Sequence, residues 1–125
     1  MDKIIEEYIT NVQMIRMSLD ELGDNKKVRQ TNKIGAKIIK IVEMIEEADA
    51  DTKKQFIDLM DSEDEDLKSR VAHHILERMH VDKSIRLKAL SIIKEKIENT
   101  QDPADRMGNQ IWLKDYYRNH PEDQE

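Results

Sequence analysis

Apolar residues recur every three or four positions through most of this chain, and that period restricts its fold more than any other feature. Only three Gly and two Pro occur in the chain, so turns should be few and the helices long. Charged residues make up 38% of the chain, well above the roughly 25% of an average globular protein. Helices tolerate this charge because charged side chains pair at i, i+4 on their outer faces. The sequence therefore predicts an all-α fold of about six helices.

Helix starts and ends can be placed from local signals. The first helix covers residues 3–22 and ends at Gly23, a residue typical of left-handed helix ends. The second extends to about residue 47, with Gly35 inside it as either a point of close helix approach or a tolerated weak position. A short third helix carries Phe56, Leu59 and Met60.

Three further starts follow along the chain. Ser62 and Glu65 have the spacing of a capping box for the fourth helix. Asp82 is the expected N-cap of the fifth helix. Asp102 is the expected N-cap of the sixth, with Pro103 at its first helical position. The sixth helix carries Met107, Ile111, Leu113 and Tyr117.

The spacing of the helices suggests antiparallel pairs. Such pairs predict an α-solenoid fragment, with a closed helical bundle as the alternative. Residues 1–118 are expected to form a single helical domain, and residues 119–125 a polar C-terminal tail that frays.

Composition excludes several classes of function. The chain has no Cys, so disulfides, thiolate catalysis and Cys-based zinc sites are excluded. Glu6 and Glu7 interrupt the apolar region that a signal peptide would require. No apolar run approaches the roughly 20 residues that span a bilayer. A cytoplasmic location without membrane contact is therefore expected. The net charge of −6 argues against nucleic acid as the main partner.

Acidic residues are concentrated in one part of the chain. Residues 43–66 hold eleven acids against two bases, a local charge of −9, which leaves +3 for the remainder. Such a field attracts a basic protein and raises its association rate, although a solvated loop gives the same pattern. We name residues 58–66 the acidic turn and predict that its carboxylates bind the partner: Asp58, Asp61, Glu63, Asp64, Glu65 and Asp66.

A basic stripe follows the second helix, spaced by three, four, four and three residues: Lys26, Arg29, Lys33, Lys37 and Lys40. A stripe of this kind can follow phosphates, but no aromatic residue between its members could stack on bases. Pairing with acids, in this chain or in a second copy, is the favoured interpretation. Which of the two charged surfaces binds a partner is left open by the sequence.

Candidate chemical sites are weak. His73, Glu77 and His80 share one helical face at a spacing that could bind zinc, but that face lies away from the apolar stripe and is expected to be exposed. From Asp61 onward, an EF-hand requires Gly and Glu where Asp66 and Ala72 stand. We therefore expect neither an enzyme nor a metal or cofactor site.

His74 and Trp112 also invite a functional interpretation. His74 near Ser69 or Ser84 lacks the Gly-flanked turn that exposes a catalytic serine. Trp112, the only Trp, is expected to cover the end of the core, although an exposed Trp112–Tyr116 pair would instead anchor a partner.

Several segments resemble a small bacterial family, a domain of unknown function with HEAT-like helical repeats. These segments begin at Gly23-Asp24-Asn25-Lys26-Lys27 and Asn32-Lys33, and continue through residues 56–60 and 67–72. The chain departs from such repeats at His73-His74. The resemblance implies stacked helices and a scaffold or inhibitor role, such as that of immunity proteins, which neutralise a neighbour's toxin.

Two functional hypotheses follow. The first is an immunity or inhibitor protein whose acidic turn docks a basic, nuclease-like toxin. The second is a structural or regulatory scaffold that self-associates, the basic stripe of one copy meeting the acidic turn of another.

Overall fold

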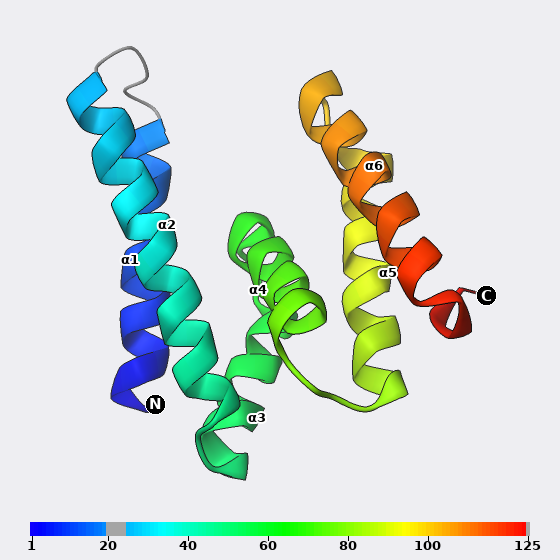
Figure 1. Ribbon diagram of the computed structural model, residues 1–125, viewed down its shortest axis with the longest axis horizontal. Helices are drawn as coiled ribbons and strands as arrows, with labels where there is room; N and C mark the ends of the chain where they lie inside the picture. Colours follow the sequence, from blue (N-terminus) through cyan, green and yellow to red (C-terminus); the bar gives the residue numbers. More distant parts are fainter. Residues whose placement is uncertain (20–24, 125) are drawn as a thin grey trace. The chain divides into compact units, whose positions relative to one another are not determined.

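The computed structural model describes residues 1–19 and 25–124, with the side chains of 18, 19 and 25–28 left aside. Over these residues the chain forms six α-helices, two short 3-10 turns and no strand (Figure 1), which confirms the all-α prediction. The chain divides into two compact units, Met1–Leu59 and Met60–Glu125. A solenoid, a closed bundle and a single domain over residues 1–118 stay predictions.

The first unit is a helical hairpin with a third, shorter helix. Helices α1 (Lys3–Leu19) and α2 (Asn25–Glu46) lie side by side, and α3 (Ala50–Asp58) contacts both (Figure 1). The expected end of the first helix at Leu22, with Gly23 and Asp24 after it, falls outside the described residues. The buried residues follow the predicted period: Ile5, Tyr8 and Val12 on α1, then Ile34, Ile38, Ile41, Val42 and Ile45 on α2.

Helix α3 is attached to the start of the chain by both apolar and polar contacts. The buried ring of Phe56 meets the ring of Tyr8 edge-on, with 4.8 Å between centroids. The backbone N–H of Asp2 donates to Gln55 Oε1 at 2.8 Å, and the Thr52 hydroxyl donates to the Asp2 carboxylate. Helix α3 therefore packs against the N-terminal end of the first unit, although it is distant from α1 in sequence.

Gly35 does not mark a tight helix crossing. A Cβ at this position would lie 3.8 Å from Ile15 Cδ1, an ordinary van der Waals distance. An alanine could therefore be accommodated at position 35. This favours the interpretation of Gly35 as a tolerated weak position over a point of close helix approach.

The second unit contains the 3-10 turn η1 (Leu59–Asp61) from Met60 onward, then α4 (Glu65–Arg78), α5 (Lys83–Asn99), α6 (Pro103–Asn119) and η2 (Pro121–Asp123). Helix α5 packs against both α4 and α6. The core of this unit includes Met60 and Met79 beside residues of the three helices: Leu67, Val71, Ala72 and Ile75 from α4, Ala89, Leu90, Ile92 and Ile93 from α5, and Tyr116 from α6.

Aspartates cap four of the helices. Asp82 and Asp102 accept from the backbone N–H groups of Ile85 and Ala104, with Pro103 following as predicted. Asp49 caps α3 in the same way. The predicted Ser62–Glu65 capping box is wrong.

Asp64 is the N-cap of α4. Its carboxylate accepts from Leu67 N–H at 3.2 Å, while Ser62 Oγ accepts from the N–H of Asp64 itself. The helix therefore begins at Glu65, two residues later than a Ser62 cap would place it. The physical reason is position. The Ser62 hydroxyl accepts a hydrogen bond in the preceding turn, whereas Asp64 directly precedes the helix and is closer to its free N–H groups.

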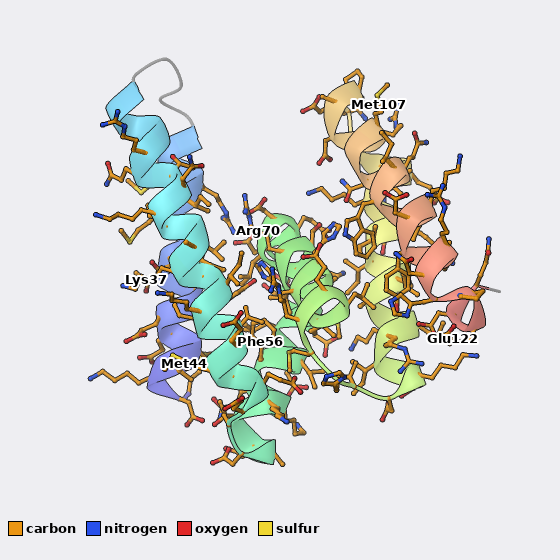
Figure 2. The ribbon with its side chains drawn as sticks, viewed as in Figure 1. Lys37, Met44, Phe56, Arg70, Met107 and Glu122 are labelled. Carbon is orange, nitrogen blue, oxygen red and sulfur yellow. The ribbon has the colours of Figure 1, made fainter. Side chains whose placement is uncertain are left out.

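The buried face of α6 is polar and aromatic rather than aliphatic. Asn109 and Tyr116 are buried, whereas Met107 and Ile111 are 62% and 57% exposed; Met107 is labelled near the start of the helix in Figure 2. Met107 and Ile111 therefore do not mark its inner face.

Over its described residues, 119–124, the C-terminal tail does not fray as expected. Residues Pro121–Asp123 form η2, and the side chain of Asp123 is buried against Arg86 of α5 and Tyr116 of α6. The prediction was wrong because the segment is polar in composition, yet one of its carboxylates has two strong donors within the unit.

Candidate functional site

The acidic turn is partly neutralised by bases of the same chain. In the first unit, Lys54 Nζ donates to Asp58 Oδ2 at 3.0 Å, and this hydrogen bond raises the pKa of Lys54. In the second unit, Lys88 Nζ donates to Asp61 Oδ1 at 2.6 Å. Both pairs are largely exposed, and exposed ion pairs add little to stability. A partner's cation could therefore replace the lysine at little cost.

Two further carboxylates of the acidic turn support α4. Asp64 caps the helix, as described above, and Asp66 accepts from Arg70 Nε at 2.8 Å one turn along (Arg70 is labelled in Figure 2). Acids in the first turn of a helix also interact favourably with its dipole. Asp64 and Asp66 therefore have structural roles that do not depend on a partner.

Glu63 and Glu65 differ from the other four. Both side chains are exposed. Within the part of the chain that the structure describes, neither forms an ion pair or a side-chain hydrogen bond. Of the six residues predicted to bind a partner, these two glutamates are the most available.

The basic stripe is exposed along α2. Arg29, Lys33, Lys37 and Lys40 all have exposed side chains, and Lys37 is labelled on its helix in Figure 2. The side chain of Lys26 lies outside the described residues. Among the side chains that the structure describes, these four bases form no ion pair. Acids on the described part of the chain therefore do not neutralise these four bases, contrary to one of the two pairings expected from the sequence.

Contrary to the prediction, the structure does not place His73, Glu77 and His80 on one exposed helix face. His80 lies beyond the end of α4. Glu77 is exposed, but His73 is half-buried against α6. Its Nε2 lies 2.8 Å from Asn109 Oδ1. Because the Asn109 amide nitrogen donates to the Asp105 carbonyl at 2.9 Å, its oxygen is left to accept from His73 Nε2–H.

Because His73 Nε2 is engaged by Asn109, it is not available as the zinc ligand that the spacing allowed. Burial lowers the pKa of His73, although the Asn109 hydrogen bond acts in the opposite direction. Over the described residues, no group of three or more His, Asp or Glu side chains is arranged to hold a metal ion.

His74 is set apart by its surroundings. Burial, and then the neighbouring His73, Arg70 and Arg78, lower the pKa of His74 to about 4. It is therefore neutral at pH 7. The charged groups that shift this pKa are bases, and they do not favour a role for His74 as a catalytic base with Ser69 or Ser84.

Trp112 joins α6 to α4 instead of covering the end of an apolar core. Its Nε1–H donates to Glu77 Oε1 at 2.8 Å, and its ring meets the His73 ring edge-on at 4.5 Å. On α6 it stacks against Tyr116 at 5.4 Å, and Tyr116 in turn stacks against His120 at 4.5 Å. We name His73, Trp112, Tyr116 and His120 the ring row. One pattern in the sequence points to it: Asn109, Trp112 and Tyr116 are spaced by three and four residues, which puts them on one face of a helix.

Comparisons with known proteins add no family. No protein-family model, curated protein or solved structure matches the chain. The resemblance to HEAT-like repeats and to immunity proteins therefore stays a prediction. None of the helices over the described residues has the length and apolar character required to cross a bilayer.

Proposed function

We propose that this chain is a protein-binding module that docks a basic protein partner through the acidic turn and blocks that partner. The observation that carries the proposal is the pair Glu63 and Glu65, two exposed carboxylates without an ion pair among the described residues. They lie in a segment whose local charge is −9 between residues 43 and 66. A field of one sign steers an oppositely charged partner during encounter.

The partner class is a basic, nuclease-like toxin, with the chain acting as its immunity or inhibitor protein. Enzymes that act on nucleic acid present basic clefts to the phosphates of their substrate. An acidic helical surface can occupy such a cleft and exclude the substrate. The exposed pairs Lys54–Asp58 and Lys88–Asp61 can exchange their lysines for bases of the toxin.

The test uses the product of the gene immediately upstream, which we expect to end in a short basic domain. Co-expression with the wild-type chain should restore the growth of cells that this domain inhibits. The double variant Glu63→Lys/Glu65→Lys should lose this protection and flatten the salt dependence of binding. Reversal of Asp64 and Asp66 is avoided, because they cap α4 and pair with Arg70. Full protection by the double variant would contradict the proposed surface.

A scaffold that self-associates is the second candidate, favoured by the exposed bases of α2: Arg29, Lys33, Lys37 and Lys40. In this function the basic stripe of one copy meets the acidic turn of another. Sedimentation at low and at high salt separates the two functions. A dimer at low salt that dissociates at high salt, and that Lys33→Glu/Lys37→Glu abolishes, supports the scaffold. A monomer at both salt concentrations excludes it.

A further inference from the structure

A recess of about 270 Å³ lies beside the ring row in the second unit. Its wall includes Glu77 from α4 and Trp112, Asp115, Tyr116, Asn119 and His120 from the end of α6. Small-molecule sites commonly span about 300–1,000 Å³. This recess is below that range, which fits one long side chain better than a cofactor.

The aromatic part of the wall is held in place by hydrogen bonds. Trp112 is fixed by its donation to Glu77, and Tyr116 by the donation of its hydroxyl to Asp123 at 2.7 Å. The two rings stack with an angle of 16° between their planes. A wall that is ordered before binding loses little conformational entropy when a group enters.

The charged part of the wall is acidic. The side chains of Glu77 and Asp115 are 42% and 58% exposed, and no Lys or Arg contributes to the wall. Glu77 uses one oxygen to accept from Trp112, and a carboxylate has about four acceptor positions. Asp115 has Arg118 Nη1 at 3.5 Å, an exposed pair that is weak and exchangeable.

We infer that this recess binds an arginine side chain of a basic polypeptide, and this inference rests on the proposed function. A guanidinium group has planar faces that stack on aromatic rings and five N–H donors that match carboxylates. A lysine ammonium is a compact, strongly hydrated charge without such faces, so it fits this wall less well. The recess therefore selects arginine within a basic partner, while the acidic turn supplies attraction at longer range.

The probes are two fluorescently labelled peptides, hexa-arginine and hexa-lysine, titrated against the full chain. Because the chain has a single Trp, the emission of Trp112 reports on the recess directly. We expect hexa-arginine to bind more tightly than hexa-lysine and to change the Trp112 emission. Equal affinity for both peptides, or unchanged Trp112 emission at saturation, overturns the inference.

Variants locate the site. Glu77→Gln/Asp115→Asn keeps an oxygen that accepts from Trp112 but removes both charges, and it should weaken hexa-arginine binding about tenfold. Arg118→Gln removes the internal competitor of Asp115 and should strengthen binding about twofold, a gain that misfolding cannot produce. The matched control is Glu98→Gln, an exposed acid of α5 outside the wall.

The results distinguish this inference from the proposed function. If Glu63→Gln/Glu65→Gln weakens peptide binding while Glu77→Gln/Asp115→Asn leaves it unchanged, the recess is excluded and the proposed function stands. If Glu98→Gln weakens binding as much as the recess variant, the arginine site is also excluded. If neither peptide binds at low salt, both the inference and the proposed function fail.

Discussion

Arg86 donates two hydrogen bonds to the carboxylate of Asp123, from Nε to Oδ2 at 2.9 Å and from Nη2 to Oδ1 at 3.1 Å. The Asp123 side chain is fully buried, and Tyr116 donates its hydroxyl to the same carboxylate. These three residues join α5, α6 and η2. The hydrogen bonds from Arg86 lower the pKa of Asp123, while burial and its bond to Asp123 raise the pKa of Tyr116.

Replacement of Asp123 by Ala should destabilise the second unit by about 2 kcal/mol, because it removes charge-assisted hydrogen bonds and leaves buried donors unpaired. Urea unfolding followed by circular dichroism measures this change. The lowered pKa of Asp123 means that its stabilisation is present above the ordinary value of 3.8 and is lost as pH falls through the lower folded-state value. The control is Glu122→Ala at the exposed neighbouring position; an equal loss in both variants contradicts the network.

Substitution of Gly108 should increase stability rather than reduce it. A Cβ at this position in α6 would meet no atom within 4 Å. Because glycine in a helix interior costs about 0.5–1 kcal/mol relative to alanine, Gly108→Ala should stabilise the chain by that amount. Gly35→Ala should do the same, with Ile15 at an ordinary distance. Thermal melts check both; a lower melting temperature for Gly35→Ala would restore the close-approach interpretation.

The helices could be predicted because their signals are local. The period of Ile34, Ile38 and Ile45 and the caps Asp82 and Asp102 each depend on residues a few positions apart. The fourth helix start was misassigned because Ser62 and Asp64 are both good caps. Only the path of the turn decides which of them faces the free N–H groups.

The polar contacts between helices could not be predicted. His73 and Asn109 are 36 positions apart, and Trp112 and Glu77 are 35 apart. No periodicity relates such residues, because their meeting depends on how α4 and α6 both pack on α5. The buried role of Asp123 was missed for the same reason: its donor Arg86 is 37 positions away.

The cap of α4 can be tested by two alanine substitutions. Asp64→Ala should cost about 1 kcal/mol, because it removes the acceptor of Leu67 N–H. Ser62→Ala should cost less than about 0.5 kcal/mol, since the serine oxygen supports only an exposed turn. Denaturant unfolding compares them. A larger cost for Ser62→Ala would favour the capping box that the sequence pattern suggested.

The lowered pKa of His74 should make the stability of the chain depend on pH. Its folded-state pKa of about 4 lies below the ordinary value of 6.5, so between these values the unfolded chain binds more protons than the folded one. Stability is therefore fully present above pH 6.5 and declines as pH falls towards 4. At pH 5 the loss relative to pH 7 should be about 2 kcal/mol from this group.

The variant His74→Gln removes the titrating ring, so its stability should change much less between pH 7 and pH 5 than that of the wild-type chain. His73, whose pKa is lowered chiefly by burial, adds a change of the same sign. The matched control is His80→Gln, because His80 is an exposed histidine just beyond the end of α4 at Arg78. If His80→Gln flattens the pH profile and His74→Gln does not, then the proton that destabilises the fold binds outside the environment formed by Arg70 and Arg78.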